Sequence, residues 1–349
     1  MEEFFSLKVI NVVAETVDAC TIELQVPSGM ADSFTYEAGQ YLTFEIPWND
    51  FKIRRCYSLC SAPETQRTLS IAVKRVEGGR GSNWFNDAVK PGMAISTSRP
   101  AGRFVLRREN TCPIVFAAGG SGITPVLSLI KSALFNSQRK MLLIYANQNR
   151  QSVIFDRALE DLAKQYSHRF AYFRHLDSDS QYLDEERISW CVGDNWQSDF
   201  YVCGPDPFMN LVEATLKNNK VPRSNIFIER FSSPVDPDYK DVDIAPSDTQ
   251  HDAAISNVKF IITFNGIDTE IPYQPGGTLL DSVLAHPYLK GVPHSCREGH
   301  CGSCMSILKT GKVKMNANRV LSKRDIAAGY VLPCQSVPLT ETVWIDFDE

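Results

Sequence analysis

The chain has 349 residues, more than one domain usually holds, and this length predicts about two or three domains. Hydrophobic residues make up 43% and charged residues 22%, the proportions of an ordinary soluble globular protein. The net charge of −5 gives no reason to expect a nucleic acid or an anionic membrane as a partner. No apolar run approaches the ~18 residues that span a bilayer, and the N-terminus lacks the basic region of a secretory signal. We therefore expect a cytoplasmic protein.

The first part of the chain, residues 1–109, is predicted to form an antiparallel β-barrel. Stretches rich in β-branched and aromatic residues recur between turn residues, which is typical of short paired strands. One short segment, 83–89, has a helical pattern. The strand-like stretches are 6–13, 20–26, 41–46 and 69–76.

From residue 110 to 231, strand-like and helical stretches alternate. This alternation predicts an α/β domain with a doubly wound parallel sheet. The expected strands are 113–118, 141–146, 170–175, 200–203 and 226–231. The expected helices are 124–135, 153–166 and 207–218.

Residues 232–256 are predicted to be a linker. They are polar, acidic and contain prolines, and they have no apolar period. The composition changes again after this stretch, so residues 257–349 are expected to form a third domain.

The third domain begins with two strand-like stretches, 258–264 and 269–273, around the turn Asn265-Gly266. Thr278 is expected to cap a helix that runs to about residue 289. Asp281 stands three residues after Thr278, where it completes a weaker form of the capping box.

Ten cysteines need an explanation in a protein expected in a reducing compartment, and four of them lie near the C-terminus. The four are Cys296, Cys301, Cys304 and Cys334. Their spacing, C-x4-C-x2-C followed by a distant cysteine, is that of plant-type [2Fe–2S] ferredoxins. Gly299 and Gly302 allow the backbone to bend closely around the inorganic sulfides. Structural zinc is the alternative, although zinc ribbons usually bring two C-x2-C pairs.

Four further motifs follow one another along the first two domains. They are Arg55-Cys56-Tyr57-Ser58 on a strand, Gly78-Gly79-Arg80-Gly81-Ser82 at the start of a short helix, Gly119-Gly120-Ser121-Gly122-Ile123-Thr124 between a strand and a helix, and Cys203-Gly204-Pro205 between a later strand and helix. Each motif is weak alone, because any barrel needs turn glycines and surface arginines. Their order along the chain is far more specific.

In these motifs and their order, the chain resembles the ferredoxin–NADP⁺ reductase superfamily, in the branch with a plant-type ferredoxin domain at the C-terminus. Members of this branch serve ketosteroid-hydroxylating and phenylacetyl-CoA-epoxidising oxygenases. The resemblance covers essentially the whole chain apart from 232–256. It implies an FAD-binding barrel, an NAD(P)-binding α/β domain and an α+β ferredoxin domain of the β-grasp type.

The resemblance also implies how FAD is held. Arg55 would neutralise a flavin phosphate, Tyr57 would pack against the flavin, and Ser58 would hydrogen-bond near the flavin N5 atom. Backbone N–H groups and a hydroxyl at the start of the short helix would bind the pyrophosphate. The residues expected to bind FAD are Arg55, Cys56, Tyr57, Ser58, Val73, Gly81, Ser82 and Asn83.

For the nicotinamide nucleotide, the resemblance implies a phosphate-binding loop that begins at Gly119. Thr124 would lie near the flavin and the nicotinamide, and Cys203 would face the nicotinamide. Glu229 and Phe231 match the family's segment that closes over the flavin. The residues expected at the nucleotide are Gly119, Gly120, Gly122, Thr124, Arg150, Ser152, Cys203, Gly204 and Phe231, and the catalytic candidates are Ser58, Thr124, Cys203 and Glu229.

The choice between NADH and NADPH stays open. After the second expected strand of the α/β domain, no carboxylate stands where NAD-selective folds often hold the ribose hydroxyls. Arg150 with Ser152 can receive a 2′-phosphate, or Arg150 can simply be solvated. The other cysteines, at positions 20, 56, 60, 112 and 191, are expected to be small buried thiols.

The domain order predicts an electron path from NAD(P)H through FAD to the cluster. A hydride carries two electrons and a cluster accepts one, so the flavin has to separate them. The expected partner is a terminal oxygenase of the Rieske non-haem iron type. The alternatives are a di-iron monooxygenase or epoxidase as partner, a redox-sensing binding protein, and a zinc-stabilised interaction module. We also hypothesise that 232–256 lets the ferredoxin domain alternate between the flavin and the partner.

Overall fold

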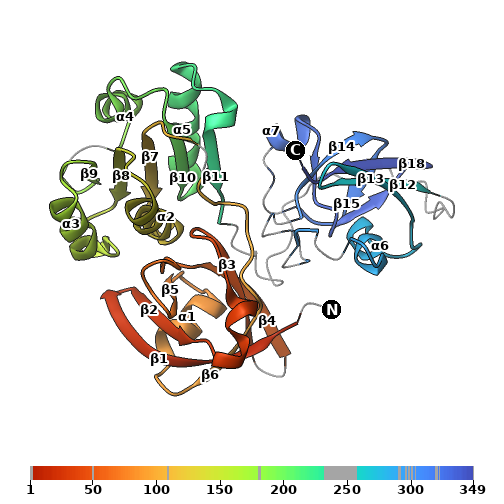
Figure 1. The fold of residues 1–349 in the computed structure, drawn as a ribbon, viewed down its shortest axis with the longest axis horizontal. Coiled ribbons are helices and arrows are strands. Elements are labelled where there is room, and N and C mark those ends of the chain that lie inside the picture. The colour runs from red at the N-terminus through yellow and green to blue at the C-terminus, as the bar shows by residue number, and fades with distance from the viewer. Residues whose placement is uncertain are drawn as a thin grey trace. The chain divides into compact units, whose positions relative to one another are not determined.

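The structure is a computed structural model that describes residues 3–48, 51–107, 110–179, 182–231, 258–289, 292–294, 297, 299, 302, 304–318, 321 and 323–348. The chain divides into two compact units, Met1–Phe231 and Ser232–Glu349 (Figure 1). The predicted linker, 232–256, lies outside the described residues. None of the helices in the described ranges is long and apolar enough to cross a membrane.

The N-terminal part of the first unit is an antiparallel sheet in the order β4-β3-β6-β1-β2-β5. Its strands are β1 (Phe5–Thr16), β2 (Ala19–Gln25), β3 (Tyr41–Trp48), β4 (Phe51–Ser58), β5 (Leu69–Lys74) and β6 (Ala94–Thr97). Leu59, just after β4, pairs with Ile71 of β5, so the two ends of the sheet meet as in a barrel. Helix α1 (Arg80–Asp87) places the fully buried Phe85 in the barrel core, and a 3₁₀ helix spans Ser28–Phe34.

The second part of the first unit is a parallel sheet in the order β11-β10-β7-β8-β9. Its strands are β7 (Ile114–Gly119), β8 (Met141–Asn147), β9 (Phe170–Leu176), β10 (Asp199–Cys203) and β11 (Ile226–Glu229). Its helices are α2 (Ile123–Asn136), α3 (Asp156–Gln165), α4 (Glu185–Val192) and α5 (Asp206–Asn218). Short 3₁₀ helices cover Gly120–Gly122, Arg150–Ser152 and Arg223–Asn225.

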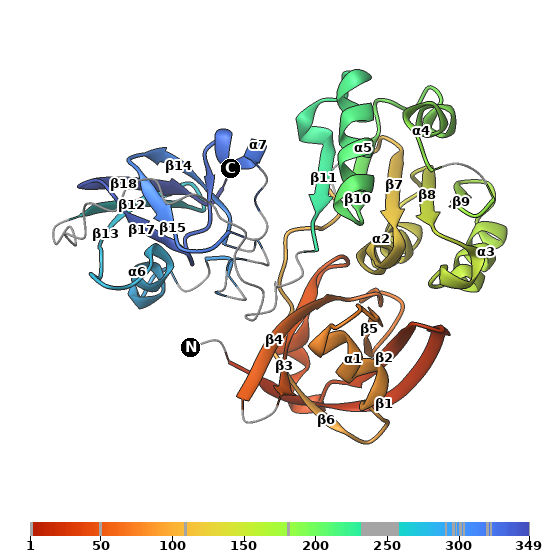
Figure 2. The ribbon, with the colours of Figure 1, turned by 180° about the vertical axis from the view of Figure 1, so that it is seen from behind.

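Helices cover both faces of the parallel sheet (Figure 2). Along β7, Phe116 packs in a core cluster with α2 and α3, while the next residue, Ala117, packs in a cluster with α4 and α5. Successive side chains of a strand point to opposite faces, so a strand covered on both faces is apolar throughout. This is why the five strands appear in the sequence as short apolar runs.

The order of the strands creates one reversal point. The chain runs from β7 to β8 and β9 on one side, and then crosses back to β10 and β11 on the other side of β7. The carboxyl ends of β7 and β10 therefore border the crevice where doubly wound sheets bind their ligands.

Helix α2 connects the parallel sheet to the barrel. The Ser128 hydroxyl donates a hydrogen bond to the Ser61 carbonyl, and Lys131 Nζ donates to the Cys60 carbonyl at 3.2 Å. Cys60 and Ala72 of the barrel belong to the same core cluster as α2. One cluster of buried residues thus contains side chains of both the barrel and the parallel sheet.

The second unit contains a mixed sheet in the order β13-β12-β18-β14-β16 and a ribbon of β15 and β17. The strands are β12 (Lys259–Phe264), β13 (Ile267–Pro272), β14 (Ser306–Thr310), β15 (Val313–Met315), β16 (Tyr330–Val331), β17 (Ser336–Pro338) and β18 (Thr342–Asp346), and the helices are α6 (Leu279–Ala285) and α7 (Lys323–Ala327). β12 pairs antiparallel with β13 and parallel with β18, and buried residues of α6 pack in the same core cluster, which is the α+β arrangement of a β-grasp domain.

The start of α6 is as predicted and its end is not. Thr278 Oγ1 accepts from the Asp281 N–H at 3.3 Å, and Asp281 Oδ2 accepts from the Thr278 N–H at 2.8 Å, which completes a capping box. The expected end near residue 289 is wrong, because α6 ends at Ala285. Pro287 follows, and the residue before a proline is driven out of the helical region; His286 is extended, with ψ 129°.

Candidate functional site

The arginine motif of β4 meets the first turn of α1. A Cβ added to Gly81 would lie 2.9 Å from Arg55 Cγ and 3.2 Å from Tyr57 Oη. Glycine therefore allows the helix start to approach both side chains closely. Arg55 Nη1 donates to the Arg54 carbonyl oxygen at 2.7 Å. A helix N-terminus next to an arginine side chain is a favourable place for an anionic phosphate. Sequence positions 55, 57 and 81, predicted to act together, are thus brought together.

Tyr57 lies in an aromatic environment. Its ring makes edge contacts with Phe85, at 4.9 Å between centroids, and with Phe44, at 6.0 Å. Burial raises the pKa of the Tyr57 phenol well above its usual value, so the ring stays neutral. A neutral aromatic ring at this position suits packing against a flavin.

The polar groups at the start of α1 differ in how many hydrogen bonds they already make within the protein. Ser82 Oγ accepts from the Val76 N–H at 3.0 Å, which leaves the hydroxyl hydrogen able to donate. The backbone and the side chain of Asn83 are both engaged, since its backbone N–H donates to the Gly79 carbonyl and its Oδ1 accepts from Arg75. The arrangement favours Gly81 and Ser82 over Asn83 as phosphate ligands.

The remaining expected flavin residues differ in accessibility. Ser58 ends β4 and is 5% exposed, whereas Cys56 is half-buried with its Sγ 3.5 Å from Thr43 Oγ1. Val73 has no exposed surface and packs in the barrel core. Val73 is thus as fully buried as Cys203, and its contact with the flavin stays a prediction.

The two glycine-containing loops of the nucleotide domain touch at the reversal point of the sheet. A Cβ on Gly122 would lie 2.2 Å from the Cys203 carbonyl oxygen, and one on Gly204 would lie 3.0 Å from Gly119 Cα. Gly120 also has a left-handed φ of +51°. These contacts require glycine, and they hold backbone against backbone where a dinucleotide is expected to bind.

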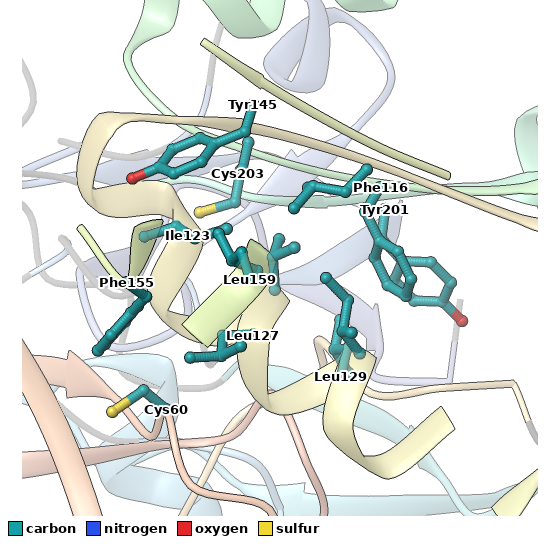
Figure 3. Packing of buried hydrophobic residues seen from close by; sticks show 14 of the residues in the cluster. Cys60, Phe116, Ile123, Leu127, Leu129, Tyr145, Phe155, Leu159, Tyr201 and Cys203 are labelled. Carbon is teal, nitrogen blue, oxygen red and sulfur yellow. The ribbon is translucent and has the colours of Figure 1, made fainter. Parts of the chain in front are cut away.

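Cys203 and Glu229 are neighbours across β10 and β11. Cys203 is fully buried in one core cluster with Ile123 and Tyr145 (Figure 3). Burial, and to a lesser degree the charge of Glu229, raise the pKa of the Cys203 thiol well above its usual value. The sulfur therefore keeps its proton, and a nicotinamide ring reaches it only by displacing the atoms that cover it.

Two further predicted residues flank this loop region. Thr124 is 2% exposed, and its hydroxyl donates to the Ser121 carbonyl at 3.1 Å. Phe231 is half-exposed at the end of the first unit. Between Glu229 and Phe231, Arg230 pairs with Asp206 at 3.0 Å and with Glu213, which ties this end of the chain to α5.

The loop after β8 contains Arg150 and Ser152, the two residues that could receive a 2′-phosphate. Ser152 Oγ donates to the Asn149 carbonyl at 2.8 Å and forms a capping box with Asn149. Arg150 lies 3.7 Å from Asp156 and 3.6 Å from Glu160, and both carboxylates also bind Arg174. Carboxylates are thus present beside Arg150, although the loop sequence itself contains none.

In the second unit, the described part of the cysteine motif fits an iron–sulfur cluster. Cys304 and Cys334 are 2% and 4% exposed within the unit's core cluster, while Cys296 and Cys301 lie outside the described residues. Gly299 has a φ of +74°, and a Cβ there would lie 2.9 Å from the Ala317 carbonyl oxygen. Buried thiols beside a tightly wrapped, left-handed loop suit a cluster that needs close backbone approach.

The expectation that the other cysteines are buried holds for two of them. Cys20 and Cys60 are buried, with burial raising their pKa to about 11 and about 12, respectively. For the remaining three the expectation is wrong, because the structure leaves them half-buried. They are Cys56, Cys112 and Cys191.

Three protein families match the chain in the order of its domains. They are the oxidoreductase FAD-binding domain over residues 6–106, the oxidoreductase NAD-binding domain over residues 116–214 and the 2Fe-2S iron-sulfur cluster binding domain over residues 262–339. The cofactors of the chain are accordingly FAD, a nicotinamide nucleotide and a [2Fe–2S] cluster.

Two relatives align with nearly the whole chain. The ferredoxin reductase component of 3-ketosteroid-9-alpha-monooxygenase from Rhodococcus rhodochrous is 36% identical over 344 residues, covering 98% of this chain and 96% of the relative. A component of 1,2-phenylacetyl-CoA epoxidase from Escherichia coli is 33% identical over 363 residues, covering 100% of this chain and 99% of the relative.

Among solved structures, phthalate dioxygenase reductase has a TM-score of 0.61 and 26% identity, covering 98% of each chain. It is described as a modular structure for electron transfer from pyridine nucleotides to [2Fe-2S]. With 36% identity to a reductase component over 98% of its length, the chain belongs to the branch of the ferredoxin–NADP⁺ reductase superfamily that joins an FAD domain and an NAD(P) domain to a C-terminal [2Fe–2S] ferredoxin domain.

Proposed function

We propose that this chain is the NAD(P)H-dependent reductase of a multicomponent oxygenase, and that it delivers single electrons to a terminal oxygenase. The observation that carries the proposal is the meeting of the loops at Gly122 and Cys203 beside a helix, α2, that is fixed to the barrel. Bound FAD and the cluster supply the conversion of a two-electron donor into single electrons. The chain itself positions both cofactors and the nucleotide.

In this proposal, the flavin site is built by β4 and α1. Arg55 supplies positive charge for a phosphate, and the N–H groups of Gly81 and Ser82 supply donors. Tyr57 presents a neutral ring to the flavin, and Ser58 provides a hydroxyl near the reacting edge. Backbone dipoles at the start of α1 and the charge of Arg55 would together bind the phosphate.

The nucleotide site is assigned to the crevice at the ends of β7 and β10. The loop at Gly119, Gly120 and Gly122 lets phosphates approach the start of α2. Thr124, Cys203 and Glu229 are the proposed catalytic residues, because they border the same crevice. The protonated Cys203 thiol offers a nicotinamide an uncharged, polarisable neighbour rather than an anion.

We place the domain boundaries at 1–109 for the FAD barrel, 110–231 for the NAD(P) domain, 232–256 for the linker and 257–349 for the ferredoxin domain. We also propose a cytoplasmic location, where NAD(P)H is available and thiols stay reduced. In the cluster, Cys296, Cys301, Cys304 and Cys334 are the proposed ligands.

We propose a Rieske non-haem iron oxygenase as the partner. The support is the 36% identity to the reductase component of 3-ketosteroid-9-alpha-monooxygenase. The second candidate is a di-iron oxygenase, which the 33% identity to the phenylacetyl-CoA epoxidase component favours. The two candidates predict transfer of electrons to different purified partners.

The first test is the visible spectrum of the purified protein, oxidised and after anaerobic addition of NADH or NADPH. Flavin bands over broad iron–sulfur absorbance, bleached within seconds by a nucleotide, are expected. A colourless protein with bound zinc would refute both cofactor assignments. Mixing the reduced protein with a Rieske oxygenase and, separately, with a di-iron oxygenase then identifies the partner class. Slow turnover with every acceptor would instead favour a redox-sensing protein.

A further inference from the structure

The residue after the last cysteine connects two segments that are far apart in the sequence. Gln335 Nε2 donates to the Arg297 carbonyl oxygen at 2.8 Å and to the Cys334 carbonyl oxygen at 2.9 Å. The same nitrogen lies 3.9 Å from Cys334 Sγ. One side-chain amide thus joins the chain around Arg297 to the buried cysteine. Both of its hydrogens are engaged with carbonyl oxygens, and its electropositive NH2 group lies close to the sulfur.

Arg297 is fixed at a second point. Its guanidinium pairs with Asp281 in the first turn of α6. Asp281 in turn accepts hydrogen bonds from the N–H and the hydroxyl of Thr278, both at 2.8 Å. Arg297 has a left-handed φ of +57°, unusual for a residue with a side chain, and these contacts stabilise it. The arginine therefore carries a fixed positive charge that Asp281 offsets.

The loop also fits closely over the glutamine. A Cβ added to Gly299 would lie 2.9 Å from Gln335 Cγ. The glutamine is half-buried, and its neighbours Cys334 and Ser336 are buried. Gln335 is therefore held by the contact with Gly299 and by its own hydrogen bonds. Its side-chain NH2 group keeps a single orientation as a result.

The charges of these groups determine whether they raise or lower the reduction potential of a cluster bound by Cys334. Reduction adds one negative charge to the iron–sulfur unit. The positive end of an amide dipole near a ligand sulfur stabilises that added charge and raises the reduction potential. A nearby carboxylate that neutralises an arginine has the opposite effect. Gln335 and Asp281 therefore act on the potential with opposite signs.

We propose that Gln335 is a positioning residue that raises the reduction potential of the [2Fe–2S] cluster, and that Asp281 lowers the potential by offsetting the charge of Arg297. The proposal rests on the proposed function, since it requires the cluster. It goes beyond that function because it assigns roles to two residues that are not ligands.

The test is a potentiometric titration of the full-length holoprotein, followed by the electron paramagnetic resonance signal of the reduced cluster. Gln335→Leu removes the donors, and we expect the equilibrium constant for cluster reduction to fall about tenfold, which is about 59 mV for one electron. Asp281→Asn is expected to shift the potential upward, by a smaller amount. Gln274→Leu makes the same chemical change at an exposed position in the same unit and should leave the potential unchanged.

Opposite shifts in the two variants support the proposal, because loosening of the loop alone would not separate them by sign. An unchanged potential in Gln335→Leu, or shifts of the same sign, would overturn it. Gln335→Glu, which keeps the shape and replaces the donor by an acceptor, should also lower the potential. Loss of the cluster from all three variants would show a purely structural role and would equally overturn the proposal. Absence of a cluster from the unmodified protein would refute the proposed function itself.

Discussion

Arg54 and Arg55 are adjacent on β4, and the strand directs them to different environments. Arg54 pairs with Glu45 of β3 at 3.0 Å, on a surface that also holds Lys52. Arg55 instead lies against Gly81 at the start of α1. Since alternate residues of a strand face opposite sides, only one of the two arginines is placed at the candidate phosphate site.

We therefore expect Arg55→Ala to weaken FAD binding by about 10- to 100-fold, because a hydrogen bond to a charged group contributes ~1.5–3 kcal/mol. The measurement is the dissociation constant of FAD by fluorescence titration of the deflavinated protein. Arg54→Ala is the matched control and should retain the affinity of the unmodified protein. Equal losses in both variants would show that general surface charge, rather than position 55, holds the flavin.

Buried thiols predict a loss of stability at alkaline pH. Burial raises the pKa of Cys60 to about 12 and that of Cys20 to about 11, while an unfolded thiol titrates near ~8.5. Above that pH the unfolded chain loses protons that the folded chain keeps, so the free energy of unfolding falls as pH rises. For Cys60 the slope is up to ~1.4 kcal/mol per pH unit.

The measurement is the thermal unfolding midpoint between pH 8 and pH 9, about one unit below the ~10 at which tyrosines of the unfolded chain titrate. The midpoint should fall across this window, and Cys60→Ala should show a shallower fall. A midpoint that stays constant up to pH 9 would contradict the assignment of these thiols as neutral buried groups.

At the residue scale, the sequence predicts the position of the nucleotide loop after β8 but not its chemistry. From the sequence, Arg150 and Ser152 can receive a 2′-phosphate or Arg150 can be solvated, and in the structure Ser152 serves as a cap for its own turn. That cap is visible in the sequence as Asn149 three residues before a serine. The carboxylates beside Arg150 are not predictable from the loop, because Asp156 and Glu160 come from α3 and meet Arg150 only in the folded chain.

Single elements are predictable where burial imposes a clear pattern. All five strands of the parallel sheet are expected from the sequence, because strands covered on both faces are apolar throughout. Helix α4 is not, because only Ile188 and Val192 of it are buried and Trp190 is 69% exposed, which leaves no clear apolar period. Helix α1 begins at Arg80, within the glycine motif expected at a helix start and before the helical pattern at 83–89, because its first turn consists of motif residues rather than apolar ones.

The contact between the β7–α2 and β10–α5 loops predicts that adding one methyl group at Gly122 lowers both stability and nucleotide affinity. In Gly122→Ala, the new Cβ would lie 2.2 Å from the Cys203 carbonyl oxygen, so one loop has to move. We expect the free energy of unfolding to fall by ~1–3 kcal/mol. We also expect weaker nucleotide binding, seen as a higher NAD(P)H concentration for half-maximal flavin reduction in stopped flow.

The control for that substitution is Gly29→Ala, because a Cβ on Gly29 meets no atom within 4 Å. This variant should resemble the unmodified protein in both measurements. A Gly122→Ala protein with normal stability and normal nucleotide dependence would mean that the two loops separate without cost.

The two compact units of the whole molecule predict that the first one functions alone. A chain ending at Phe231 keeps both sheets and the core they share. We expect this fragment to bind FAD and to be bleached by the same nucleotide as the full protein, without iron and without transfer to an oxygenase. A fragment that fails to retain FAD would show that the second unit is needed to complete the flavin site.

The hypothesis that 232–256 lets the ferredoxin domain alternate between the flavin and the partner is tested by shortening this linker. Deleting residues 240–249 should slow either flavin-to-cluster or cluster-to-partner transfer, because a shorter connection restricts the positions open to the ferredoxin domain. Replacing the same ten residues with glycine and serine keeps the length and should preserve both rates. Unchanged rates in the deletion variant, measured by stopped flow with the partner present, would refute the hypothesis.

The attachment of α2 to the barrel has a consequence for the construction of chimeras, in which one domain is replaced by that of a relative. Ser128 and Lys131 reach the carbonyls that follow the flavin-binding strand, and the two sheets bury side chains in one cluster. A chimera that takes only its parallel sheet from a relative would have to rebuild that shared core, and we expect most such chimeras to misfold. Chimeras of relatives are therefore expected to fold when the barrel and the parallel sheet both come from the same parent protein.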